Sequence, residues 1–517
     1  MSDKRQFFKH TLIFGVGGII GQLVPLILLP LYTNYLPPEA YGTLDLIMMT
    51  SDIISTVFLI GGIRLAAMTF YKQAESEEAR RRIAVTISSL LWLAIAIAIV
   101  LTVCFIDTLD FFLPTGQKDV LAFGLTITLL EGLVTVPMTL TQARLESLRF
   151  VLTNLTMAVS RMGLCIYFVA GLEWGIWGVL YAQAIVVIVF GIVLTYRELR
   201  IGSLSPDTSK WREILLFCLP LVPNGILAFL YGASGRMSAL HFGPYEGKIA
   251  AIGAVGLYAL ANRLMSVSQS VGIMPIQRVW TAEMYDIYKQ PDAPSIFGNF
   301  ILRLLCVQAF FALGISLFAD EIVRIVSDPS YQEAARMIPY FGLYSLLVLF
   351  ANQMNNTFFL TRKTHYNLFC TFFAFYFAFL FMCHFVPRWG VWGAVLAYNL
   401  AYLPYIGIVY YLTQRLFRIR YPFGKITKLL IVTILCYMLS LLCGSGVELC
   451  TLPPEQELSK WEKVMDAWHR VRFLPVVAKM GVMFLWGVLV WFSGILSPED
   501  KALAIRVFKK GLQKLHR

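Results

Sequence analysis

Apolar residues recur along the chain in long runs that short polar segments separate. Most runs cover about 20 residues or more, the length that an α-helix needs to cross a hydrocarbon core of about 30 Å. The pattern predicts an all-α polytopic membrane protein. We expect about fourteen transmembrane helices, near 11–31, 43–70, 83–105, 119–141, 150–171, 174–195, 214–241, 252–276, 298–318, 335–360, 366–386, 391–413, 426–446 and 473–495.

Composition agrees with this pattern and excludes a soluble protein. The chain of 517 residues is 58% apolar and only 14% charged, whereas soluble domains carry about 25% charged residues. Its mean hydropathy is +0.69. The net charge of +12 is typical of a membrane protein that retains cationic loops in the cytoplasm, so we expect no nucleic acid partner.

The distribution of cations over the loops predicts the orientation. If the chain begins in the cytoplasm, most Lys and Arg residues of the loops lie on the inner side, and the C-terminal tail adds more. We therefore expect both termini to be cytoplasmic. The first apolar run is about 20 residues long and no small-x-small cleavage site follows it, so we expect a transmembrane helix and not a signal peptide.

A repeat in the sequence divides the chain. The run Trp174–Gly178 (WGIWG) recurs as Trp389–Gly393 (WGVWG), and Leu194–Ile201 matches Leu412–Ile419. A weaker match sets Tyr41-Gly42 beside Val255-Gly256. Six helices, an even number, separate the copies, so the two halves are related by an axis along the membrane normal.

We therefore predict two pseudo-symmetric six-helix lobes followed by two C-terminal helices. The N-terminal lobe covers residues 1–200 and the C-terminal lobe covers 201–420. Residues 421–496 hold helices 13 and 14 with an outer interfacial segment between them. Residues 497–517 form a basic amphipathic tail on the cytoplasmic side, which either binds anionic lipid or is a solvated helix.

Several arginines lie inside the predicted spans: Arg64, Arg161, Arg236 and Arg263. A charge at the bilayer centre costs about 2.5 to 3.5 kcal/mol on insertion scales, so each needs a wet cavity or a partner. Arg161 lies eleven residues after Phe150, which at 1.5 Å per residue is roughly 16 Å deep. Arginine binds phosphate through two hydrogen bonds and keeps its charge when desolvated. The set predicts a cationic cavity for a phosphate-bearing anion.

In an alternative interpretation these arginines snorkel to the membrane surface or pair internally with Asp52 and Glu131. Asp45 and Asp52 lie one heptad apart on one helix face, and Glu131 lies in helix 4. Asp52 and Glu131 are also the candidates for ion coupling. In helix 10, Asn352 and Asn356 share a face and could contact a glycan, although interhelical hydrogen bonds would explain them equally well.

Signatures of enzymes are weak. A glycine-rich segment near Gly15 lies inside a predicted transmembrane helix, where small residues allow close packing. The nine cysteines follow no metal or redox spacing, and neither a nucleotide motif nor a catalytic set stands out. We predict no catalytic residue, no cofactor and no metal site.

Three segments carry a family resemblance: Tyr35–Gly42 (YLPPEAYG), Gly256–Leu264 (GLYALANRL) and Trp389–Gly393. With the six-plus-six-plus-two arrangement, they make the chain resemble the polysaccharide-transporter family of bacterial O-antigen and exopolysaccharide flippases. That family belongs to the multidrug/oligosaccharidyl-lipid/polysaccharide exporter superfamily. The resemblance covers about residues 8–495.

The resemblance implies transport without chemistry. The substrate would be an undecaprenyl-diphosphate-linked oligosaccharide, which moves from the inner to the outer leaflet of the bacterial cytoplasmic membrane as two lobes rock around a cationic cavity. Membrane lipids, a polysaccharide polymerase and chain-length machinery are the implied partners. The alternatives are a multidrug/cation antiporter on the same fold, which would need a net acidic cavity, and a membrane glycosyltransferase or polymerase.

Overall fold

A computed structural model of the chain describes residues 28–58, 62–63, 66–67, 70–71, 74, 76–112, 118–144, 146–201, 205–219, 221–361, 363, 365–445, 473–496, 498 and 501. Over these residues the ordered elements are helices, and no strand occurs among them. Nine of the described helices are long and apolar enough to cross a membrane. The predicted all-α polytopic fold is confirmed.

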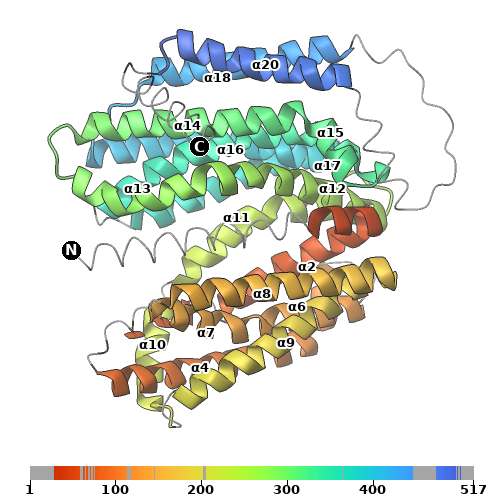
Figure 1. Ribbon diagram of the computed structural model, residues 1–517, viewed down its shortest axis with the longest axis vertical. Helices are drawn as coiled ribbons and strands as arrows, with labels where there is room; N and C mark the ends of the chain where they lie inside the picture. Colours follow the sequence, from red (N-terminus) through yellow and green to blue (C-terminus); the bar gives the residue numbers. More distant parts are fainter. Residues whose placement is uncertain are drawn as a thin grey trace, which may run out of the picture. The chain divides into compact units, whose positions relative to one another are not determined.

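The described residues form two compact units, and the first consists of residues up to Ala259 together with 326–331 and 371–397. In this unit α9 packs against α6, α7 and α8, and α2 packs against α6 and α11 (Figure 1). Its helices are α2 (Pro38–Val57), α4 (Glu77–Cys104), α5 (Ile106–Phe112), α6 (Lys118–Leu130), α7 (Gly132–Ala143), α8 (Ser147–Cys165), η1 (Ile166–Gly171), α9 (Gly175–Ile201), η2 (Thr208–Lys210), α10 (Trp211–Cys218), α11 (Leu221–Phe242) and the first part of α12 (Lys248–Val267).

The second unit holds the remaining described residues. Here α14 packs along α16 and α18, and α18 lies beside α20 (Figure 1). The elements that begin after α12 are η3 (Ser268–Ile273), α13 (Met274–Ile287), α14 (Ala293–Leu317), α15 (Ala319–Val326), η4 (Pro329–Tyr331), α16 (Glu333–Leu360), α17 (His365–Leu416), α18 (Phe423–Ser445) and α20 (Phe473–Phe492). Of these, η4 and part of α17 belong to the first unit.

Every predicted span from the second onward overlaps a described helix. The first span lies mostly outside the described residues, so the count of fourteen stays a prediction. The outer interfacial segment and nearly all of the basic tail also lie outside the described residues. The division into lobes at residues 200 and 420 likewise stays a prediction.

The tryptophan-glycine repeat forms the same joint twice. Gly175 and Gly390 both adopt a left-handed backbone, with φ of 56° and 54°, a conformation that costs side chains other than glycine about 1 to 2 kcal/mol. In the first copy Trp174 stacks on Phe168 at 5.1 Å between ring centroids, and in the second Trp389 stacks on Phe385 at 5.5 Å. The repeat is therefore one of local structure as well as of sequence.

Glycine also permits a close helix crossing in the first unit, between α2 and α12. A Cβ atom at Gly42 would overlap the backbone oxygen of Ile252, and one at Gly256 would overlap the backbone oxygen of Pro38. These two glycines are the pair that the weaker sequence match aligned. Their lack of side chains lets the two backbones touch.

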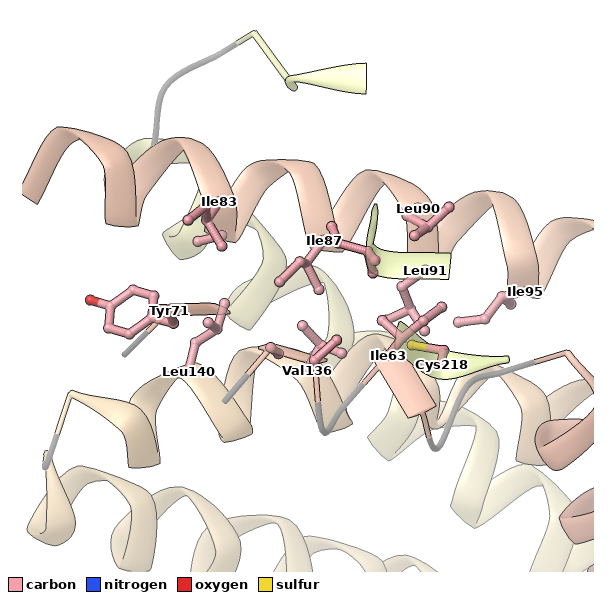
Figure 2. Close-up of a cluster of buried hydrophobic side chains, with 14 of the residues drawn as sticks. Ile63, Tyr71, Ile83, Ile87, Leu90, Leu91, Ile95, Val136, Leu140 and Cys218 are labelled. Atoms are coloured by element: carbon pink, nitrogen blue, oxygen red, sulfur yellow. The ribbon is translucent and has the colours of Figure 1, made fainter. Parts of the chain in front are cut away.

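Apolar packing in the first unit centres on α4. Its residues Ile83, Ile87, Leu91 and Ile95 repeat every four positions and are nearly fully buried. Figure 2 shows them facing Val136 and Leu140 of α7 and Cys218 of α10. This spacing places them on one face of the helix, which packs against α7 and α10.

Candidate functional site

The predicted intramembrane charges of the first unit gather on α2, α8 and α11 and at the junction of α6 and α7. Glu131 lies at that junction, where one predicted span breaks into two helices. Arg161 lies on α8, which continues into the π-helical turn η1. Such turns occur frequently at functional sites.

Arg161, Gln183 and Glu131 form a hydrogen-bonded chain. Arg161 Nη2 donates to Gln183 Oε1 at 2.9 Å, and Gln183 Nε2 donates to Glu131 Oε1 at 2.8 Å. Arg161 Nη1 lies 3.8 Å from Glu131 Oε1, an ion pair without a close hydrogen bond. The buried Nε atom of Arg161 has no partner among the described residues. The guanidinium is thus held in place, and its Nε–H donor makes no hydrogen bond with a described residue.

Two further side chains lie beside this chain. The hydroxyl of Tyr32 and the thiol of Cys165 are 3.6 Å apart, and both residues are buried. Tyr32 also lies close enough to Arg161 to interact with its charge. The surroundings of Arg161 therefore include a phenol hydroxyl, which can donate or accept a hydrogen bond.

A second cluster joins α11 to α2. Arg236 forms an ion pair with Asp45, and its Nη2 donates to Asp45 Oδ1 at 3.4 Å. The guanidinium carbon lies 5.5 Å from the ring centroid of Tyr258, a cation–π distance. Asp52, one heptad along α2 from Asp45, interacts electrostatically with both Arg236 and Asp45. The carboxylates of α2 thus neutralise Arg236 in this structure.

The other two predicted arginines differ from these. Arg263, on the part of α12 that belongs to the second unit, has an exposed side chain and no ion pair with any residue that the structure describes. Arg64 lies outside the described residues. In this structure Arg161 thus pairs with Glu131, as the alternative interpretation expects, whereas Arg236 pairs with Asp45 and not with Asp52.

The asparagine run of helix 10 divides between two environments. Asn352 on α16 is exposed, and Asn356 is half-buried and donates to Gln353 Oε1 at 3.2 Å. Asn355 is buried and donates to the hydroxyl of Tyr405 on α17 at 3.0 Å. The hydrogen bond between α16 and α17 is therefore made by Asn355. Contact of Asn352 and Asn356 with a glycan stays a prediction.

Two features escaped prediction from the sequence. Gln183, the bridge between Arg161 and Glu131, is the single amide of the apolar run 174–195, but its presence there does not say which residues it contacts. Lys479 in α20 forms an ion pair with Glu321 of α15 at 2.6 Å, with both side chains mostly buried. The lone lysine in an apolar run was a signal of a partner, but Glu321 lies in a different predicted segment, 158 residues away.

Ion pairs also close one end of the first unit. Arg144 at the end of α7 makes two hydrogen bonds to Glu198 of α9, at 2.8 and 2.6 Å, and a third to Tyr71 at 3.1 Å. Burial by itself lowers the pKa of Arg144, but the bonds and charge of Glu198 outweigh burial and raise the pKa above its ordinary value. Beside it, Arg197 donates to Glu146 at 2.6 Å. By the predicted topology these pairs lie at the cytoplasmic surface.

Comparison with known proteins links this architecture to one family. The model of the family described as "Polysaccharide biosynthesis protein" matches residues 7–281. No curated protein matches the chain.

Solved structures share the fold at low sequence identity. Lipid II flippase MurJ in an inward closed conformation superposes with a TM-score of 0.65 at 12% identity, covering 95% of this chain and 99% of that one. A multidrug resistance MATE transporter of the MOP superfamily matches in an inward-facing conformation with a TM-score of 0.61 at 14% identity, covering 76% and 94%. An outward-facing MATE structure gives 0.53 at 16%, covering 79% and 95%.

Proposed function

The chain belongs to the polysaccharide biosynthesis protein family, and from this premise we propose that it is a flippase for a lipid-linked glycan. It would move a polyprenyl-diphosphate-linked oligosaccharide from the inner to the outer leaflet by alternating access. It is a multi-pass membrane protein. The proposal places it in the bacterial cytoplasmic membrane with both termini inside, and assigns it no catalytic step.

Arg161 is the observation that carries this proposal. Its guanidinium hydrogen-bonds to Gln183 and interacts with the hydroxyl of Tyr32, the nearest carboxylate oxygen lies 3.8 Å away, and its Nε has no partner among the described residues. A guanidinium within a membrane span that keeps free donors favours an incoming acceptor with several oxygens. A diphosphate supplies these oxygens together with the negative charge.

The exchange of partners provides a mechanism. Before the substrate binds, Glu131 neutralises the charge of Arg161 without forming a close hydrogen bond to it. A diphosphate that reaches Arg161 replaces Glu131, while Gln183 keeps the guanidinium in place. The two side chains are 27% and 44% exposed within the chain, but they lie in predicted spans, where an unpaired charge is costly. Glu131 must therefore take up a proton or another cation once the diphosphate replaces it. This requirement makes Glu131, with Asp52 at the second cluster, the proposed coupling residue.

The other predicted contacts complete the proposed site. Arg236 would exchange Asp45 for substrate in the same manner, and Arg263 and Arg64 would add positive charge. The exposed Asn352 and its neighbour Asn356 are the proposed glycan contacts, because amides can pair with the hydroxyl groups of a sugar. Polysaccharide polymerase and chain-length machinery, which would take the glycan next, are the proposed partners.

One observation favours a second candidate, a multidrug or cation antiporter. Three carboxylates, those of Asp45, Asp52 and Glu131, lie in the described spans of the first unit, against the two arginines Arg161 and Arg236. This excess of carboxylates would allow one of them to bind a transported cation. The two candidates differ in the sign of the transported headgroup.

Transport by the purified chain tests both candidates. Vesicles that contain the full chain are loaded with a lipid-linked oligosaccharide in one leaflet, and the fraction that an impermeant lectin reaches on the other side is followed in time. We expect exposure of the glycan with the protein and none without it. Uptake of ethidium with no exposure of the glycan would instead establish the antiporter, and covalent change of the substrate by the protein alone would establish a transferase.

A further inference from the structure

A long part of the second half of the chain contains no acidic residue. Between Glu333 and Glu448 there are nine Lys and Arg residues and neither Asp nor Glu. Five of the nine lie together, at the end of α17, in the connection to α18 and in the first turns of α18: Arg415, Arg418, Arg420, Lys425 and Lys428. We call these five residues the α17–α18 basic cluster.

The cluster is free to meet an outside partner. The side chains of Arg415, Arg418, Arg420 and Lys428 are exposed, and that of Lys425 is half-buried. None of the five forms an ion pair or a side-chain hydrogen bond with any part of the chain that the structure describes. Most other cations near the predicted inner surface of the first unit have an acidic partner, as Arg80 has Glu77.

The backbone that carries the cluster is ordered. Gln414 donates to the backbone oxygen of Ile419 at 2.8 Å, and the backbone N–H of Arg420 donates to the oxygen of Pro294 at 3.1 Å. The rings of Tyr410, Tyr421 and Phe423 pack on one another with centroids 5.5 to 5.9 Å apart. The cations are therefore displayed from a fixed turn between two helices.

The sequence repeat offers an internal comparison. Arg197 and Arg415 occupy the same position of the two copies, but Leu416 replaces Glu198. In the first copy Arg197 donates to Glu146 and its side chain is only 14% exposed. In the second copy Arg415 lies over the ring of Tyr411 at 4.4 Å, and that ring is 54% exposed. The same arginine is internally neutralised in one copy and left for an external anion in the other.

We propose that the α17–α18 basic cluster binds the headgroup of an anionic phospholipid. Tyrosine and phenylalanine rings at the end of a transmembrane helix lie at the level of the headgroups. Arginine forks match phosphate oxygens, and each cation near a membrane surface strengthens attraction to anionic lipid about fivefold. The exposed rings of Tyr411 and Phe423 would contact the upper part of the acyl chains.

The test measures lipid binding and does not depend on transport. Delipidated full-length protein is titrated with phosphatidylglycerol or with phosphatidylcholine, and the first binding event is quantified by native mass spectrometry. The triple variant Arg415→Gln, Arg418→Gln, Arg420→Gln should bind phosphatidylglycerol at least tenfold more weakly and phosphatidylcholine as before. The triple variant with Lys at the same positions should remain within about threefold of the wild type.

A matched control removes three cations elsewhere. Arg80→Gln, Arg82→Gln and Arg149→Gln lower the net charge equally, but these arginines are paired with Glu77, Glu78 and Glu146, so this variant should stay within twofold of the wild type. Equal weakening in the control and test variants, or no weakening in the test variant, would overturn the proposal. The proposal would also be overturned if the test variant bound undecaprenyl diphosphate more weakly but phosphatidylglycerol as before. The cluster would then bind the substrate and not a phospholipid. Thermal unfolding of each variant verifies that it is folded.

Discussion

At the scale of single residues, Gln183 has an unusual position because it bonds to an arginine and a carboxylate at once. An amide can do so without a charge of its own, because its oxygen accepts and its nitrogen donates. We predict that Gln183→Leu lowers glycan export at least tenfold, because both Arg161 and Glu131 lose a bond and the guanidinium loses its orientation. Gln183→Asn, which keeps the amide on a shorter arm, should retain part of the activity. Export is measured as glycan exposed on the outer leaflet per amount of protein in the membrane. Wild-type export in Gln183→Leu would contradict this role.

Arg161 and Glu131 lead to a separate prediction. Arg161→Ala removes a charged hydrogen-bonding group worth about 1.5 to 3 kcal/mol and should abolish export while membrane insertion stays normal. Arg161→Lys should rescue poorly if the fork is needed. A purely structural pair predicts recovery in the double variant Arg161→Ala, Glu131→Gln, since no buried charge is then left unpaired. Recovery there would show that Arg161 does not bind the substrate.

The sequence predicted part of this site, for a physical reason. Arginine and acidic residues in apolar runs are costly, so Arg161, Arg236 and Glu131 are conspicuous, and so is the need for partners. Which partner each one takes depends on helix packing, and Asp45 pairs with Arg236 across 191 positions of the chain. The role of Gln183 could not be predicted, because a single uncharged amide in a span can be satisfied by many partners and does not require an ionic one.

At the scale of helices, the two glycine joints allow a graded test. Gly175→Ala and Gly390→Ala both force alanine into a left-handed backbone at about 1 to 2 kcal/mol. At Gly390 the new Cβ would also overlap the ring and hydroxyl of Tyr245, whereas at Gly175 the nearest atom, in Leu36, is 3.9 Å away. Gly390→Ala should therefore lower the thermal unfolding midpoint more than Gly175→Ala. Because Tyr245 accepts a hydrogen bond from the N–H of Val391 at 2.7 Å, Tyr245→Ala has its own cost. In a Tyr245→Ala background, the two glycine substitutions should lower the midpoint equally. Equal midpoints for the two single variants would show that the Tyr245 side chain can move away from the new methyl group without cost.

The crossing of α2 and α12 gives another prediction at this scale. Gly42→Ala and Gly256→Ala place a methyl group against backbone atoms, which can move only if the helices separate. We expect each to lower the yield of folded protein and to cost about 1 to 3 kcal/mol. Gly163→Ala is the control, because a Cβ there meets no atom within 4 Å and alanine favours helix by about 1 kcal/mol. The measurement is monodisperse protein recovered after heating. Recovery in Gly42→Ala equal to that of the control would mean that the crossing is loose.

Helix positions were predictable from the apolar runs because length and hydropathy alone select them. The internal breaks were not predictable. Pro137 in the run 119–141 indicates an irregular helix, but not that α6 and α7 separate at Glu131, and the sequence does not indicate the π-helical turns η1 and η3. These irregularities depend on contacts between helices and not on local preference. The break at Glu131 and the turn η1 after Arg161 occur next to the charged residues of the candidate site.

For the whole molecule, the predicted orientation can be tested directly. In a background without cysteine, Lys118→Cys should react with an impermeant maleimide in intact cells, and Glu77→Cys should react only after the membrane is opened. The reason is the excess of Lys and Arg in the loops that we place inside. Both residues begin described helices, α6 and α4, so each substitution is at a helix end and should not disturb the fold. Labelling of Glu77→Cys from outside would reverse the topology.

The twofold tryptophan-glycine joint also has an evolutionary consequence. If the halves descend from one duplicated ancestor, selection has since kept the left-handed glycine and the stacked tryptophan in both descendants but has let the charges drift apart. Glu198 and Leu416 stand at the same inherited position. Ancestry in this chain therefore preserves backbone turns better than electrostatics. A role established for an arginine in one half should not be transferred to its counterpart in the other half, and hybrids that exchange the joints between halves should fold more readily than hybrids that exchange the helix ends.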